Sequence, residues 1–268
     1  MAKLLYDVKD EIAWIRLNRP EVLNALSSEE LGAFVSALRE AADDPQVRAI
    51  IISSVGDSFC AGEDLKIALE EYPQIRAGEI HPILDIVEDI TEGLQAIPRI
   101  IRMARKVVIA SVRGLAVGGG FEIAIDSDLI VAADNARFGF PEGNAGMTIT
   151  GGATKLLPMS VGLNKARELV LTGEFIDAAE AHRIGLVNRV VPAGQEDEEA
   201  ERLARLIMTR APLSVASHKR LLHNAAQIGL EATLELEKQT VTNMIYTEDY
   251  GEAITAFGEK RKPAFKGR

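Results

Sequence analysis

The chain has 268 residues and 47% hydrophobic content, so it holds enough apolar material for a large buried core. Its formal net charge of −10 argues against a nucleic acid partner, because binding a phosphate backbone requires clustered Lys and Arg. The single cysteine, Cys60, excludes an internal disulfide, and no uncharged apolar stretch is long enough to cross a bilayer. We therefore expect an acidic globular enzyme, and because the first residues lack the apolar core of a signal peptide, we expect it in the cytoplasm.

The first two thirds of the chain alternate between strand-like and helix-like patterns. Apolar or alternating runs predict strands at residues 11–17, 49–55, 107–112 and 129–132. Ser27 and Glu30 have the spacing of a capping box, which predicts an amphipathic helix that runs to about Ala42. A further helix is expected from Gly118 to Asp126. Strands separated by helical segments are typical of βαβ units with right-handed crossovers, so this part predicts an α/β body.

Two other regions are mainly helical in pattern. Residues 67–105 are helix-like but carry several Pro and Gly residues, which predicts a helical segment broken into pieces. After Val191 the pattern becomes almost continuously helical, with helices expected at residues 196–210, 213–228, 231–246 and 250–259. The apolar face that carries Leu203, Leu206 and Ile207 is expected to build subunit contacts.

Several common catalytic patterns are missing from the sequence. The four histidines form no metal-ligand spacing with each other or with Cys60, so no metal site is expected. Neither the Gly-x-Ser-x-Gly elbow of serine hydrolases nor the Gly-Lys-Ser/Thr end of a phosphate-binding loop occurs. The glycine run from Gly114 to Gly120 lacks the Gly-x-Gly-x-x-Gly spacing, which argues against a dinucleotide-binding fold.

Two turns of small residues follow predicted strands. Gly118, Gly119 and Gly120 open the predicted helix, where unpaired N–H groups favour negative charge. Residues 59–66 offer a similar turn after another strand. Amides from two such turns that converge on one oxygen would stabilise an oxyanion, although an isolated glycine motif is more often a turn followed by a helix N-cap.

Five motifs, taken in order and spacing, resemble the crotonase superfamily of enoyl-CoA hydratases and isomerases over nearly the whole chain. They are residues 18–26, 59–66, 114–122, 138–142 and 257–263. The resemblance implies an α/β fold, with a crotonase-like spiral core of repeated ββα units and a helical C-terminal region. Residues 1–191 would form the core with the CoA and active sites, and residues 192–268 would pack on the core and in the oligomer. A homotrimer or homohexamer is implied.

The resemblance also implies how an acyl-CoA thioester would be bound. The two amides of an oxyanion hole would come from Glu63 and Gly119, although family members more often carry a small or apolar residue at the first of these positions. Lys66 and Lys260 would reach the nucleotide phosphates, as mobile point charges suited to that role. The positions implied in substrate and CoA binding are Ala61, Glu63, Asp64, Leu65, Lys66, Gly119 and Lys260. Taken alone, either lysine would be an ordinary surface residue.

Glu122 and Glu142 match the two catalytic acids of hydratases in this superfamily. A carboxylate in the first turn of a helix is favoured by the helix dipole even without a chemical role, but Phe121, Ile123, Phe140 and Met147 flank the acids and predict an apolar, pKa-raising cleft. The implied reaction adds water reversibly to a trans-2-enoyl-CoA and gives a 3-hydroxyacyl-CoA. Glu122 would deprotonate the water and Glu142 would exchange the proton at C2. No cofactor is required, because coenzyme A belongs to the substrate.

Other readings stay open at this point. Typical hydratases have Pro-Gly at the positions of Ile149 and Thr150, and the polar residues Asn144 and Thr148 lie nearby, so a polar or branched acyl group, or an isomerase, lyase or hydrolase reaction, remains possible. Asp126 reads better as a helix-surface carboxylate or a capping contact than as a third acid. Some proteins of this fold bind RNA through a lysine-rich helix, but residues 31–44 contain no lysine. A non-catalytic subunit is the third alternative.

Overall fold

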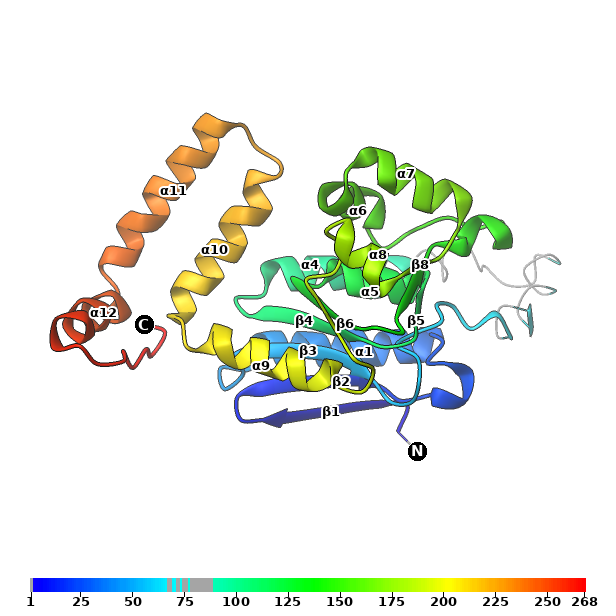
Figure 1. The fold of residues 1–268 in the computed structure, drawn as a ribbon, viewed down its shortest axis with the longest axis horizontal. Coiled ribbons are helices and arrows are strands. Elements are labelled where there is room, and N and C mark those ends of the chain that lie inside the picture. The colour runs from blue at the N-terminus through cyan, green and yellow to red at the C-terminus, as the bar shows by residue number, and fades with distance from the viewer. Residues whose placement is uncertain (1, 67–68, 71–72, 74–76, 78–88) are drawn as a thin grey trace.

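The computed structural model describes residues 2–66, 69–70, 73, 77 and 89–268. Within them, one sheet has the strand order β1-β2-β3-β4-β6-β9 and a second has the order β5-β7-β8 (Figure 1). The strands of the large sheet are β1 Leu4–Lys9, β2 Ile12–Leu17, β3 Ala49–Ser54, β4 Val107–Val112, β6 Leu129–Ala133 and β9 Arg189–Val191. Those of the small sheet are β5 Leu115–Val117, β7 Arg137–Gly139 and β8 Ile176–Asp177. The described helices of the body are α1 Ser28–Asp43, α4 Ala96–Met103, α5 Gly119–Asp126, α6 Ala153–Val161, α7 Leu163–Thr172, α8 Ala178–Arg183 and α9 Glu196–Met208.

The predicted α/β body is confirmed, although the patterns revealed only β2, β3, β4 and β6 and did not reveal β1, β5, β7, β8 or β9. β1 pairs antiparallel with β2 through a tight turn at Asp10 and Glu11, whose φ angles are 49° and 65°. β1 alternates half-buried and exposed residues at the sheet edge, so it lacks the continuous apolar run that marked the inner strands. All other neighbours in the large sheet are parallel, as expected for strands joined by helical crossovers.

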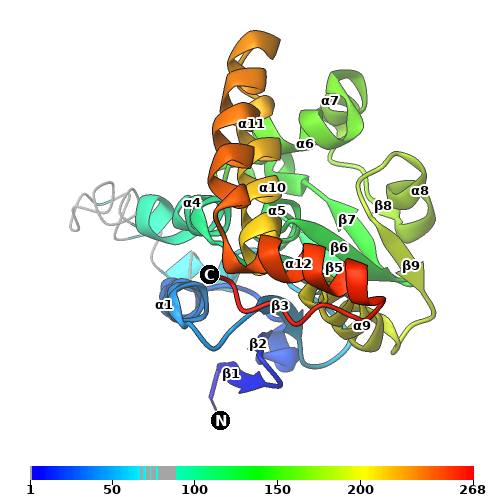
Figure 2. The ribbon, with the colours of Figure 1, turned by 90° about the vertical axis from the view of Figure 1, so that its left-hand side faces the viewer.

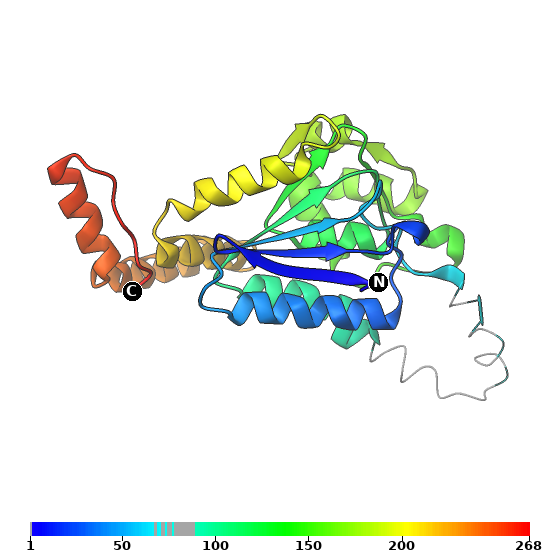
Figure 3. The same cartoon turned by 90° about the horizontal axis from the view of Figure 1, so that it is seen from below.

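Both faces of the large sheet are covered, which explains why its inner strands are mostly apolar. In β3, Ile50 and Ile52 pack on the side of α1, whereas Ala49 and Ile51 pack on the side of α9 (Figure 3). Burial of each such Ile is worth about 1.5–3 kcal/mol. Covering both faces in this way makes every residue of the strand a core residue.

The role expected for the first C-terminal helix was wrong. Leu203 of α9 is buried against β3 and β4 of the same chain, and Ile207 packs on the same cluster. Only Leu206 points outward, with 43% of its surface exposed. Because the open face of the sheet needs an apolar cover, α9 is used within the chain and its apolar face is not available for subunit contacts.

The last three helices extend away from the body. They are α10 Pro212–Ala225, α11 Leu230–Ile245 and α12 Glu248–Glu259, close to their predicted bounds (Figures 1 and 2). α10 is joined to the body by Lys219, whose Nζ donates to Asp128 Oδ2 at 2.6 Å and to Lys106 O at 2.8 Å. No helix among the described residues has the length and apolar character required to span a membrane.

The segment predicted to be a broken helix lies partly outside the described residues. Its described end contains a π-helical turn, Asp89–Leu94, followed by α4. Pro98 sits in the first turn of α4, where no intrahelical N–H bond is lost. We expect residues 67–105 to lie beside the acyl pocket of the implied enzyme and to set its chain-length preference, and this stays a prediction.

Candidate active site

Two glycine turns touch each other beside the small sheet. Gly62 has a φ of 88°, and a Cβ on it would lie 2.9 Å from Val117 O and 3.8 Å from Gly118 Cα. Gly118 has a φ of 53°, a region that residues with a side chain seldom adopt. A bridge between Cys60 and Ala116 holds the two segments in register. Gly118 is therefore required for its backbone conformation, and Gly62 is required for its close approach to the other turn.

The amides that follow these glycines are both unpaired. Leu26 N donates to Gly62 O at 2.7 Å and Asp64 N donates to Leu26 O at 2.9 Å, so the N–H of Glu63 points away from Leu26. Gly119 is the first residue of α5, where no intrahelical acceptor exists for its N–H. Neither amide donates to any acceptor in the described part of the chain. The Glu63 side chain is exposed.

Glu122 is buried in the first turn of α5. Only 2% of its surface is exposed, and its Oε1 accepts a hydrogen bond from Gly151 N at 2.5 Å. A Cβ on Gly151 would lie 3.0 Å from the carboxyl carbon, so glycine is needed there to admit the acid. Burial raises the pKa of Glu122 to about 7, against the opposing effect of the Gly151 amide and with a further rise from the charge of Glu142.

Glu142 approaches the same place from a short helical turn, Pro141–Ala145. A Cβ on Gly118 would lie 2.8 Å from its Oε1, so the carboxyl group packs directly on the second glycine turn. Its Oε2 is buried and accepts no hydrogen bond from the described residues. Burial raises the pKa of this acid as well. The structure thus brings together the two acids and the two amides that the sequence singled out.

Aromatic packing sets the position of α5 relative to β7. The ring of Phe121 stacks on that of Phe140 with centroids 4.5 Å apart and lies 5.3 Å from that of Phe138. The expectation for Met147 was wrong, since 53% of its surface is exposed because it follows the short helical turn on the outside of the molecule. Cys60 is buried in the same region, and burial raises the pKa of its thiol to about 12, which makes it unreactive.

Asp126 is not the helix-surface carboxylate that the sequence suggested. It lies one turn after Glu122, is 7% exposed, and its Oδ1 is buried without a partner among the described residues. α5 is covered by α4 and α6, so the residue one turn beyond Glu122 has no route to solvent. Burial, with the charge of Glu122, raises the pKa of Asp126 well above its usual value.

A cavity of about 470 Å³ adjoins the loop that holds Glu122. It is lined by residues of α4 and of the loop before α6, namely Gln95, Pro98, Arg99, Ile149, Thr150, Gly151, Gly152 and Thr154. Gln95 Nε2 donates to Thr150 O at 3.2 Å and ties the two walls together. Sequence reasoning named Thr150 here but missed Gln95, which sits at the break between two helices. Asn144 and Thr148 are exposed and do not line this cavity.

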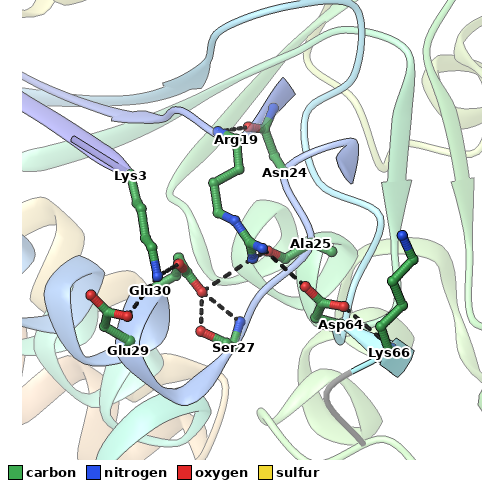
Figure 4. Close-up of polar contacts among 9 residues, drawn as sticks. All are labelled: Lys3, Arg19, Asn24, Ala25, Ser27, Glu29, Glu30, Asp64 and Lys66. Atoms are coloured by element: carbon green, nitrogen blue, oxygen red, sulfur yellow. Dashed lines mark hydrogen bonds and ion pairs between the residues drawn. The ribbon is translucent and has the colours of Figure 1, made fainter. Parts of the chain in front are cut away.

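The residues expected to bind coenzyme A are only partly brought together. Ala61 is half-buried, and Leu65 and Lys66 are exposed beside the glycine turns. The Asp64 carboxylate is buried and engaged by Arg19, so it faces the protein (Figure 4). Lys260 is the C-cap of α12, which lies at the opposite end of the molecule from β5 and β7 (Figures 1 and 3). A single chain does not place Lys260 beside Lys66.

A buried acid and a half-buried acid, both of raised pKa, lie beside two amides that are unpaired among the described residues, and together they define an acid–base site that can also hold an oxyanion. The comparisons agree with this class. Residues 7–268 match the enoyl-CoA hydratase/isomerase family, and the chain belongs to that family.

Similar proteins cover the chain from end to end. The short-chain-enoyl-CoA hydratase of Clostridium acetobutylicum is 35% identical over 99% of this chain and 98% of its own. The 2,3-dehydroadipyl-CoA hydratase of Escherichia coli is 35% identical over 100% of both chains. Among solved structures, the enoyl-CoA hydratase of Bacillus anthracis superposes with a TM-score of 0.87 at 31% identity over 100% of both chains. That of a Polaromonas species has a TM-score of 0.88 at 32% identity, covering 98% of this chain and 99% of the other. The fold is therefore crotonase-like, as the resemblance implied.

Proposed function

We propose that this protein is an enoyl-CoA hydratase that adds water reversibly to a trans-2-enoyl-CoA. The observation that carries the proposal is the packing of the Glu142 carboxyl group on the Gly118 turn, with Glu122 in the first turn of the helix that starts there, beside the free amides of Glu63 and Gly119. Several relatives at about 35% identity carry the name of hydratase, which supports the same reaction.

In the proposed reaction each group has a task that its position supports. The amides of Glu63 and Gly119 donate to the thioester oxygen, which gains negative charge as a nucleophile attacks C3. Glu122 takes a proton from water while the water oxygen bonds to C3, and the electron pair of the C2–C3 double bond moves toward the thioester as an enolate. Glu142 then donates a proton to C2 as the enolate collapses. A pKa near neutrality suits a group that must both accept and release a proton.

Water and substrate would be oriented together by this site. The unpaired Oε2 of Glu142 leaves an acceptor free for a water that Glu122 also holds. Holding the water and C3 in contact converts a bimolecular step into one within the complex, which supplies much of the rate enhancement. Coenzyme A is part of the substrate, so the proposed reaction uses no resident cofactor.

The coenzyme A portion would lie along residues 61–66. Lys66 is exposed there and can approach the nucleotide phosphates. Since α12 lies at the far end of the same chain, Lys260 can join this site only from a neighbouring copy. The proposed trimer or hexamer would supply that copy. Such an enzyme would work in the cytoplasm.

The acyl group would enter the cavity beside Thr150. Its walls combine apolar Pro98 and Ile149 with polar Gln95 and Thr154, which suits an acyl chain that carries a polar group or a branch. The relatives include hydratases named for a short chain and for a dicarboxylic acyl group, so both belong in the substrate panel.

The decisive experiment measures the hydration of a panel of substrates by the wild type, Glu122→Gln and Glu142→Gln. The panel holds crotonyl-CoA and, in addition, longer, branched and ω-carboxylated 2-enoyl-CoAs. Each glutamine is nearly isosteric but cannot transfer a proton, so each variant should lose at least about 10²-fold in kcat while its affinity for a saturated acyl-CoA changes little. Glu174→Gln, at an exposed acid outside the site, serves as the control. A wild type that hydrates none of the panel, or variants that keep full turnover, would refute the proposal. Loss in Glu142→Gln alone, with double-bond migration as the product, would indicate an isomerase.

A further inference from the structure

Arg19 joins three segments behind the first glycine turn. Its NH2 donates to Asp64 Oδ2 at 3.1 Å, and its NH1 donates to Ala25 O at 3.1 Å and to Glu30 Oε2 at 3.3 Å (Figure 4). Its side chain is 17% exposed, while those of Asp64 and Glu30 are 8% and 3% exposed. The guanidinium therefore bridges two nearly buried carboxylates, one on the glycine turn and one at the start of α1.

The carboxylates on either side of Arg19 are themselves held. Asp64 Oδ1 accepts from Lys66 N at 3.3 Å, so both oxygens of this acid are engaged. Glu30 Oε2 accepts from Ser27 N at 3.0 Å, and Lys3 Nζ lies 3.0 Å from Oε1. Although burial raises the pKa of Glu30, the hydrogen bonds of Ser27 and Lys3 and the charge of Arg19 bring it below its usual value, so Glu30 stays ionised.

The backbone beside Arg19 is tied down as well. Arg19 N donates to Asn24 Oδ1 at 2.7 Å, and Asn24 Nδ2 donates to Ser58 O at 2.8 Å and to Val55 O at 3.0 Å. Asn24 has a φ of 56°, a conformation that Asn tolerates better than most residues. The segment that carries Arg19 is thereby fixed to the end of β3, from which the glycine turn starts.

Asp64 follows Glu63 directly, and Leu26 bonds to the backbone on both sides of Glu63. Ala25 O, which accepts from Arg19, precedes Leu26. The guanidinium of Arg19 therefore holds both segments of the bridge between Leu26 and Glu63, and this bridge orients the Glu63 amide. A donor of this kind must be held within about 0.5 Å of its working position to be effective.

We propose that Arg19 is a positioning residue for the oxyanion hole, acting through Asp64 and Ala25 to aim the N–H of Glu63 at the thioester oxygen. This inference rests on the proposed function, because it assigns a task to an amide of that site. It goes beyond the acids and amides themselves, since Arg19 touches neither of them. The planar guanidinium fork donates to three acceptors from two nitrogens, which a lysine ammonium, a single point charge, does not reproduce.

The test compares Arg19→Lys with the matched control Arg16→Lys. Arg16 also forms a carboxylate pair, at 2.6 Å to Asp7, but on the exposed hairpin away from the site. Each enzyme is measured for kcat, for affinity toward a saturated acyl-CoA, for Tm, and for the thioester carbonyl stretching frequency of that bound ligand in an infrared difference spectrum. The carbonyl frequency reports hydrogen bonding by the hole and would not respond to a purely structural ion pair.

Arg19→Lys should lose about 10-fold or more in kcat, and the stretching frequency of the bound carbonyl should shift back toward its value in water. Its affinity for the saturated acyl-CoA should stay within a few fold of wild type. Arg16→Lys should change none of these quantities. Asp64→Asn should act in the same direction, and the double variant should lose no more than the larger single loss. An unchanged kcat, or a loss of rate that follows a fall in Tm while the carbonyl frequency stays at the wild-type value, overturns the role of Arg19 and leaves the hydratase intact. A wild type with neither hydration nor a carbonyl shift overturns both proposals.

Discussion

At the scale of single residues, the site depends on what two glycines leave out. Gly151 and Gly118 each leave the space that the carboxyl group of one acid occupies, so that Glu122 can be buried and Glu142 half-buried in the same region. Burial favours the neutral form of a carboxyl group, and it is the first cause of the raised pKa of both acids. The same burial that prepares the acids for proton transfer therefore works against the stability of the fold.

The pH dependence of stability should reveal this conflict at Glu122. Its folded-state pKa of about 7 lies above the ordinary value of 4.5, so between these values the folded protein binds more protons than the unfolded chain and stability falls as pH rises. Glu122→Gln has no such proton to lose, and its stability relative to wild type should increase from pH 4.5 to pH 7 by on the order of 3 kcal/mol. Thermal unfolding across this range measures the effect. Equal pH profiles for the wild type and the variant would mean that Glu122 titrates normally.

At the scale of elements, the junction of α10 with the body depends on a buried ion pair. Asp128 lies in the connection between α5 and β6, and its Oδ2 is 2.6 Å from the Nζ of Lys219 in α10. The same carboxylate also accepts a hydrogen bond from Val108 N at 2.8 Å. Burial lowers the pKa of Lys219 and raises that of Asp128, while each partner's charge opposes the shift of the other. Charges of this kind are costly to leave unpaired.

Lys219→Met should therefore destabilise the protein by about 3–5 kcal/mol, because it leaves Asp128 buried without a cation. Lys238→Met removes an exposed lysine paired with Glu235 and should cost less than about 1 kcal/mol. Chemical denaturation of both variants measures the difference. Adding Asp128→Asn to Lys219→Met should recover part of the loss, and similar costs for the two lysines would contradict a structural role for the buried pair.

At the scale of the whole molecule, α10, α11 and α12 expose an apolar surface that the chain itself does not cover. The exposed large apolar residues on these helices are Leu222, Leu230, Leu234, Val241, Ile245, Tyr246, Tyr250, Ile254 and Phe257. Of these, Tyr246 and Phe257 are 85% and 86% exposed. Large apolar residues exposed on neighbouring helices in this number are typical of an interaction surface, and a second copy of the chain is the partner that the proposed CoA site also requires.

We expect a trimer or hexamer in solution, and Tyr246→Glu combined with Phe257→Glu should dissociate it, since charge on an apolar interface is strongly unfavourable. Light scattering gives the mass. Leu171→Glu, at an exposed apolar residue of α7, is the control and should leave the assembly intact. If Lys260 comes from a neighbouring copy, KM should rise on dissociation. A wild type that is a stable monomer at micromolar concentration would disprove the expectation.

The sequence by itself determined the inner strands β2, β3, β4 and β6, the helices α1 and α5 and the C-terminal helices, and it supplied the candidate site residues. Local signals were sufficient there, since the capping box of Ser27 and Glu30, the apolar runs of β3 and β4 and the glycine run before α5 each depend on residues close together in the chain. The acids and glycine turns could also be named, because the family motifs carry them.

Only the tertiary structure decided which faces meet. The apolar helical spacing at Leu203 is the same whether the residue faces a partner subunit or its own sheet. Its burial against β3 follows from the sheet having an open face. The burial of Asp126, the pairing of Arg19 with Asp64 across 45 residues, and the distance of α12 from the glycine turns depend on packing between remote segments. Such contacts leave no periodic signal along the chain, because a side chain's burial and its ionic partners are set by the elements that the fold places around it.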